Sequence, residues 1–163
     1  MRFTNIRQQL CLILCGYVLV GCVHPALAPM KRELEVSLES LPKSAEFQNI
    51  ATTELSVYAS RFGGSCTYGR VSRALATAHT PKDAIARYLN LLQAAGWEVE
   101  DANSSVLLNR GQHERLVLRV VESDDQASVD PFRSMPAYRT AREQGQSVLI
   151  LDLTYINPKR DGC

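Results

Sequence analysis

Apolar residues between positions 80 and 97 recur with the period of an α-helix. Five of them are spaced i, i+3, i+4, i+7 and i+10 and therefore share one stripe: Ile85, Tyr88, Leu89, Leu92 and Ala95. Thr80 followed by Pro81 is typical of a helix start, because Thr caps the first free backbone N–H groups and Pro fits the first helical position. Gly96 suits the left-handed residue that ends a helix. The pattern predicts an amphipathic helix over residues 80–96.

Alternating or continuous apolar residues predict strands on both sides of this helix, over residues 66–77, 97–100, 106–109, 115–122 and 147–156. The alternation slips at Gly69, which predicts a β-bulge there. Residues 148–151 are continuously apolar, as in a central strand covered on both faces. Because turns of hairpin length join most of these strands, we expect an α+β fold. It would be a mainly antiparallel sheet of four to five strands with one principal amphipathic helix (80–96) packed on it.

Two segments outside this pattern are less regular. Residues 33–39 alternate polar and apolar side chains, which predicts a strand, but Pro42 interrupts the pattern. The composition as far as residue 53 is compatible with a loosely ordered arm. Between the last two strands, residues 124–146 form a long excursion with a weakly helical stretch at 137–144. Excursions of this length are commonly either functional or mobile, and the sequence leaves both open.

The first 22 residues have the features of an export signal. Arg2 and Arg7 precede an apolar run of 11 residues, 10–20, and no acidic residue occurs before Glu33. The run has the length of a signal-peptide core and is too short to span a bilayer, which takes about 20 residues.

The run ends in Leu19-Val20-Gly21-Cys22, which resembles the lipobox of bacterial lipoproteins. The resemblance implies a signal peptide at 1–21, cleavage before Cys22 and a diacylglyceryl group on the Cys22 thiol. It also implies that the protein is anchored by lipid to the bacterial cell membrane or outer membrane, facing outside the cytoplasm. An ordinary secretory signal that happens to contain Cys22 is the alternative.

A lipidated Cys22 also assigns a fate to each of the other cysteines. Of the five, Cys11 and Cys15 leave with the signal peptide and Cys22 carries lipid, so that Cys66 and Cys163 remain in an oxidising compartment. We expect a disulfide between these two. A redox pair would more typically be C-x-x-C, and a metal site needs more ligands than two isolated cysteines.

The predicted organisation is therefore a signal peptide (1–21), a lipidated tether and loosely ordered arm (22–53), and a single globular α+β domain (54–163). The strand beginning Cys66-x-Tyr68, the helix start Thr80-Pro81-x-Asp83 and the helix end Ala95-Gly96-Trp97 together resemble a pattern in small exported bacterial domains of unknown activity. The resemblance covers about residues 60–122. It implies a fold type and an envelope setting, and it carries over no catalytic residue.

Motifs that carry chemistry are nearly absent. The sequence contains no G-x-S-x-G, H-E-x-x-H or phosphate-binding glycine motif, so that we expect no cofactor and no metal. His113 and Glu114 are neighbours, but adjacent residues of a strand point apart, which argues against a shared acid–base site. Asp152 interrupts the most apolar strand. It is either a buried carboxylate, or a residue on an edge face, or the partner of a strand arginine such as Arg119 or Arg73.

The balance of charges reduces the number of possible functions. With 18 basic and 17 acidic residues and a net charge of +1, the chain has no bulk positive charge for nucleic-acid binding. We expect a lipid-anchored envelope protein that acts as a non-catalytic binding or accessory module, with the membrane and an envelope protein as partners. The alternatives are an envelope enzyme with an unrecognised site and a small solute-binding lipoprotein. The latter is disfavoured because a domain of about 110 residues is small for a two-lobed binding protein.

Overall fold

The computed structural model describes residues 27–59, 67–102, 105–122 and 130–156. The expected signal peptide and the cysteines Cys22, Cys66 and Cys163 lie outside these residues. The helices are α2 (Leu27–Glu39), α3 (Pro81–Ala94), α4 (Asp130–Arg133) and α5 (Pro136–Glu143). The strands are β1 (Gln48–Thr52), β2 (Ser56–Ala59), β3 (Thr67–Thr77), β4 (Glu98–Ala102), β5 (Val106–Arg110), β6 (Glu114–Val120) and β7 (Ser147–Ile156).

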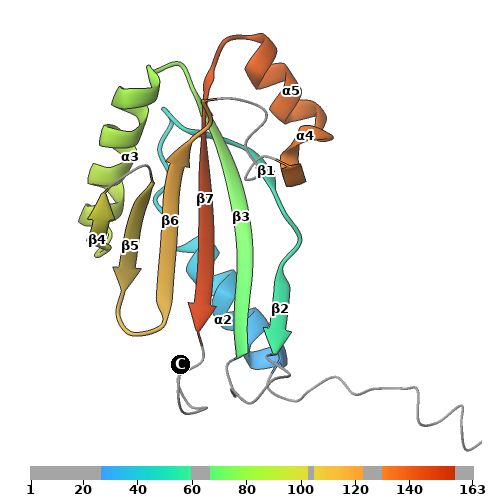
Figure 1. The fold of residues 1–163 in the computed structure, drawn as a ribbon, viewed down its shortest axis with the longest axis vertical. Helices are drawn as coiled ribbons and strands as arrows, with labels where there is room; N and C mark the ends of the chain where they lie inside the picture. Colours follow the sequence, from blue (N-terminus) through green and yellow to red (C-terminus); the bar gives the residue numbers. More distant parts are fainter. Residues whose placement is uncertain (1–26, 60–66, 103–104, 123–129, 157–163) are drawn as a thin grey trace, which may run out of the picture.

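The strands form one seven-stranded sheet in the order β1-β3-β7-β6-β5-β4, and β2 pairs with the remaining part of β3 (Figure 1). Every strand pairing in the described chain is antiparallel. The expected α+β class with a mainly antiparallel sheet is thus confirmed. The expected number of four to five strands is too low, because β1 and β2 were not recognised as strands.

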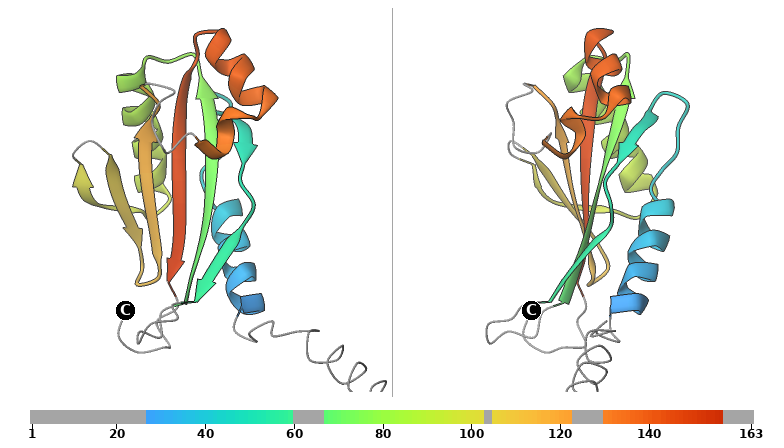
Figure 2. Two further views of the ribbon diagram at one scale, coloured as in Figure 1. Left: turned by 45° about the vertical axis from the view of Figure 1, so that its right-hand side comes forward. Right: turned by 90° about the vertical axis from the view of Figure 1, so that its right-hand side faces the viewer.

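One face of the sheet is covered by α2 and α3 (Figure 2). In α2, Met30, Leu34 and Ser37 are buried at helical spacing, and Leu34 packs in the main core. The strand expected over 33–39 is therefore wrong, and Val36, which that alternation would place beside Leu34, is 59% exposed. The loosely ordered arm expected as far as residue 53 is wrong too, since α2 and β1 belong to the packed fold.

Gly69 lies in β3 without a bulge, because its pairing with β2 and β7 continues through it in register. The irregularities of the sheet lie instead in β1, between Asn49 and Ala51, and in β4, between Val99 and Asp101. Gly69 permits the close approach of α2: a Cβ at this position would lie 3.0 Å from Leu34 Cδ2. The expected bulge is therefore wrong, and the glycine serves packing.

The predicted helix over 80–96 is confirmed as α3 with its caps. Thr80 is the N-cap and accepts a hydrogen bond from the Asp83 amide at 3.3 Å. At the other end, the Trp97 amide donates to the Leu92 carbonyl at 3.0 Å, and Gly96 has φ +85°. This is the paired hydrogen-bond pattern in which a left-handed glycine ends a helix. Tyr88 and Leu92 are buried against the sheet, whereas Ala95, at the end of the expected stripe, is exposed.

The opposite face of the sheet is covered over only part of its length. Phe132 and Tyr138, from α4 and α5, pack on Ala74, Val148 and Ile150 of β3 and β7. The helix expected over 137–144 is thus confirmed as α5. Residues 148–151 are buried on both faces, as expected for a central strand. Farther along β3, β6 and β7, no helix of the described chain covers this second face (Figure 2).

Candidate functional site

The uncovered part of the second face carries a cluster of charged side chains. Strand alternation and register place Arg70 and Ser72 of β3, Asp152 of β7, and Arg115 and Arg119 of β6 on this side. We call these five residues the open sheet face. The group contains three arginines and one carboxylate, so it is locally basic.

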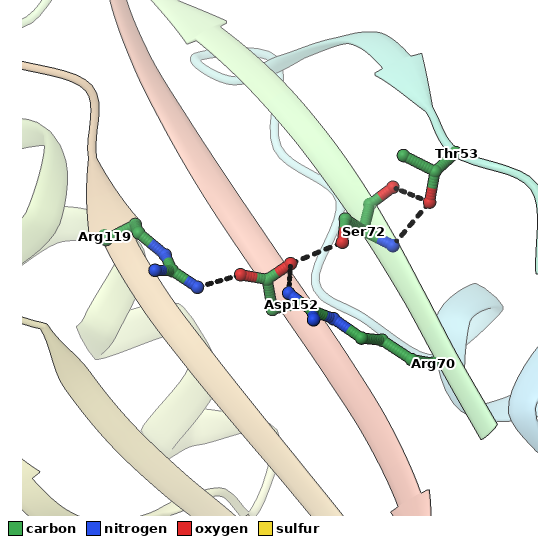
Figure 3. Close-up of polar contacts among 5 residues, drawn as sticks. All are labelled: Thr53, Arg70, Ser72, Arg119 and Asp152. Atoms are coloured by element: carbon green, nitrogen blue, oxygen red, sulfur yellow. Dashed lines mark hydrogen bonds and ion pairs between the residues drawn. The ribbon is translucent and has the colours of Figure 1, made fainter. Parts of the chain in front are cut away.

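Asp152 is the centre of the open sheet face and is only 4% exposed (Figure 3). Its Oδ1 accepts hydrogen bonds from the Ser72 hydroxyl and from Arg70 Nη2, the latter at 3.1 Å. Its Oδ2 accepts a hydrogen bond from Arg119 Nη2. Asp152 is therefore both buried and paired with Arg119, so that two possibilities offered as alternatives by the sequence hold together. The alternative pairing with Arg73 is wrong, because Arg73 follows Ser72 in the strand and points to the other face.

Thr53 connects this cluster to the edge of the sheet. The Ser72 amide donates to Thr53 Oγ1 at 2.9 Å, and the Thr53 amide donates to the Ser72 carbonyl at 2.9 Å. Thr53 lies between β1 and β2, so these bonds maintain the β3 ladder where the edge strand is interrupted (Figure 3). Ser72 is held in place from both sides and presents its hydroxyl to Asp152.

The hydrogen bonds to the Asp152 oxygens decide which chemistry this cluster can perform. Both oxygens of Asp152 already accept from cationic or hydroxyl donors, and a carboxylate so engaged is poorly placed to accept a proton from a substrate. Its geometric effect is to hold two guanidinium groups on the sheet surface. The Arg70 and Arg119 side chains remain 52% and 30% exposed, and Arg115 is exposed beside them. The open sheet face is thus suited to contact negatively charged groups.

The His113–Glu114 neighbours do not form a common site. The Glu114 carboxylate accepts from Arg110 Nη2 at 3.0 Å and from the Ser37 hydroxyl. His113 instead lies beside the Tyr155 ring, tilted to it, with centroids 6.0 Å apart. Burial raises the pKa of Glu114, but the bonds from Arg110 and Ser37 outweigh it and leave the pKa below 4.5. Arg110 also lies 4.7 Å from the Trp97 ring centroid, so this cluster ties α2 to the β5–β6 hairpin and to the end of α3.

The fold brings together a histidine and a glutamate that the sequence did not indicate as a pair. His79, which lies between β3 and α3, has its Nε2 3.1 Å from Glu46 Oε2, and Arg87 Nη1 approaches the same oxygen at 3.5 Å. Glu46 and His79 line an open polar cavity of about 370 Å³. They are 33 positions apart, so no local motif could have indicated the pair.

The described residues offer few other candidate sites. In the described parts of the chain, no group of three or more His, Cys, Asp or Glu residues is placed to hold a metal ion. Among the same residues, no helix is both long and apolar enough to cross a membrane. The sites predicted at Cys22, Cys66 and Cys163 fall outside the part of the chain that is described. Comparison with models of known protein families, with curated proteins and with solved structures finds no match.

Proposed function

We propose that this chain is a lipid-anchored, non-catalytic binding module of the bacterial cell envelope, and that it docks an acidic surface of an envelope protein on its open sheet face. The proposal of the anchor rests on the leader of residues 1–21 and on Cys22. Two or more acyl chains hold a protein stably at a bilayer, whereas one chain does so only marginally.

The observation that carries the binding role is the fixed array of arginines around Asp152. Arg70 and Arg119 are oriented by bonds to one buried carboxylate, and Arg115 takes part in no ion pair with the described residues. Arginine side chains held in one geometry lose less entropy on binding, and their planar donors match carboxylate groups. The acidic residues of β4 lie on the edge strand next to β5, which separates them from β6, and Glu100 there accepts a hydrogen bond from Asn109 of β5.

The alternative of an envelope enzyme that uses Asp152 is less favoured by the same geometry. A general base needs a free oxygen within hydrogen-bond reach of a substrate proton. Ser72, Arg70 and Arg119 take three of the about four acceptor sites of the Asp152 carboxylate, and the residue is only 4% exposed, so that a substrate has little access to it.

The test is crosslinking and affinity capture of the full-length tagged protein from membranes. Arg115→Glu reverses a charge on the open sheet face without breaking an observed ion pair, and Arg32→Glu makes the matched change on exposed α2, on the other face. We expect one partner in fixed ratio, captured by wild type and by Arg32→Glu and lost with Arg115→Glu. Equal capture by both variants would overturn the docking surface, and turnover of a small substrate that depends on Asp152 would favour the enzyme.

A further inference from the structure

A small pocket lies on the helical side of the sheet, behind the open sheet face. It has a volume of about 200 Å³ and is bounded by the end of α2, the chain that follows it, β1 and β3. Its polar lining consists of Glu39, Lys43, Ser44, Asn49 and Arg73, and we call it the Arg73 pocket. Phe47 and Leu75 supply the apolar part of the wall.

Arg73 is a buried cation with little compensation. The residue is 8% exposed, and its Nε is buried without a hydrogen-bond partner. Its one ion pair within the described chain joins Nη2 to Glu39 Oε1 at 3.7 Å, which is too long for a hydrogen bond. A buried charge costs free energy unless it is paired and hydrogen-bonded, so a guanidinium left in this state calls for a missing partner.

The carboxylate nearest to Arg73 is itself loosely placed. Glu39 is 67% exposed and accepts a hydrogen bond from Lys43 Nζ at 3.1 Å, four residues farther along the chain. The hydrogen bond from Lys43 lowers the pKa of Glu39 most, and the positive charges of Lys43 and Arg73 lower it further. Glu39 therefore lies between the two cations of the pocket as an exposed anion that a ligand of the same charge could replace.

We propose that the Arg73 pocket binds the carboxylate or phosphate group of a small ligand, which displaces Glu39 from Arg73 and Lys43. Guanidinium donors match the geometry of both groups, and hydrogen bonds to charged oxygens are the stronger kind. Asn49 and Ser44 add uncharged polar groups at the wall, and Phe47 and Leu75 exclude water from one side. The site is independent of the open sheet face, because Arg73 and its neighbour Ser72 point to opposite sides of β3.

The proposal predicts opposite effects for two charge removals in the same pocket. Removing Glu39 takes away the competing anion, so Glu39→Gln should bind an added anion at least about threefold more tightly, which corresponds to about 0.7 kcal/mol. Removing Lys43 takes away an attracting charge, so Lys43→Gln should bind it severalfold more weakly. Lys82→Gln, on exposed α3, is the matched control and should leave affinity unchanged.

The experiment is a titration of the full-length mature protein, in nonionic detergent at constant ionic strength, with inorganic phosphate and separately with acetate. It is followed by the NMR shifts of the Arg73 Nε–H group and of the Lys43, Ser44 and Asn49 amides. We expect saturable shifts confined to these groups, with the Glu39→Gln and Lys43→Gln effects in opposite directions. Saturation by acetate alone would identify a carboxylate site, and saturation by phosphate alone a phosphate site.

Two results would overturn the proposal. One is the absence of saturable shifts up to about 10 mM of either anion, a level at which a site with a Kd of 1 mM would be about nine-tenths filled. The other is binding that Glu39→Gln leaves unchanged or weakens. Arg73→Met should abolish binding, but it removes a buried group; the two surface variants keep the test decisive if Arg73→Met does not fold.

Discussion

The substitution Asp152→Asn tests the charge network at the centre of the sheet. Asparagine keeps the volume of the side chain but removes its charge and replaces one acceptor oxygen with a donor NH₂ group. That donor must face either Arg119 or the Ser72 and Arg70 pair, all of which are donors in the structure. The change therefore leaves at least one arginine without its acceptor, and this happens at position 152, which is only 4% exposed.

The size of the effect follows from the exposure of the two arginine partners. The bond to Arg70, whose side chain is 52% exposed, contributes little, because exposed ion pairs are worth about 0–1 kcal/mol. Breaking a buried pair costs about 3–5 kcal/mol, and the 30% exposure of Arg119 places this site at the lower end. We expect a loss of about 3 kcal/mol in the free energy of unfolding and a fall in Tm of about 10 °C.

The assay is urea and thermal unfolding of the purified protein, followed by circular dichroism, with Arg70→Gln as the control that should cost about 1 kcal/mol or less. The double variant Asp152→Asn, Arg119→Gln should lose less free energy of unfolding than the sum of the two single variants. Each single change leaves the other residue of the pair without its partner, and the double change does not. If Asp152→Asn lies within about 0.5 kcal/mol of wild type, the carboxylate does not hold the arginines, and the reasoning about the open sheet face fails.

Three further predictions concern other clusters. Gly96→Val should destabilise the protein by at least about 1 kcal/mol in urea unfolding, because valine is strained at φ +85°, and an unchanged midpoint would mean that α3 does not end there. The lowered pKa of Glu114 means that its bonds to Arg110 and Ser37 add stability above the ordinary value of 4.5, which is lost as pH falls through the folded pKa; Glu114→Gln should therefore flatten the acid limb of a stability–pH curve, and an unaltered limb would contradict this. Burial raises the pKa of Tyr88 to about 12, so ultraviolet titration should lose its latest phenolate transition in Tyr88→Phe, and the same late transition in the variant would refute the assignment.

Local sequence signals predicted the parts of the fold that depend on neighbouring residues. Helix α3 was predicted with its start and end because its caps and apolar stripe lie within one continuous segment. Strands β3, β4, β5, β6 and β7 were predicted from apolar patterns that likewise lie within single continuous segments. Helix α2 was missed because the Leu34-x-Val36-x-Leu38 alternation satisfies the strand period over seven residues, while its buried residues follow the helical period over a longer span.

The sites depend on contacts that the sequence does not display. Asp152 stood out because a carboxylate interrupts an apolar strand, and this made a pairing with some strand arginine predictable. The choice between Arg119 and Arg73 required the register of three strands, which places Arg73 on the opposite face. The Glu46–His79 pair and the Arg73 pocket join residues more than 30 positions apart, and nothing in their local sequence marks them.

The most direct test of the proposed role is the intact mass of the protein extracted from membranes of the producing cell. The account predicts a polypeptide that begins at Cys22 and carries the added mass of a diacylglyceryl group, with Cys66 and Cys163 together two hydrogens lighter than their free thiols. A chain that begins at Met1 with an unmodified Cys22 thiol would contradict the anchor, the compartment and the envelope partner that follow from it.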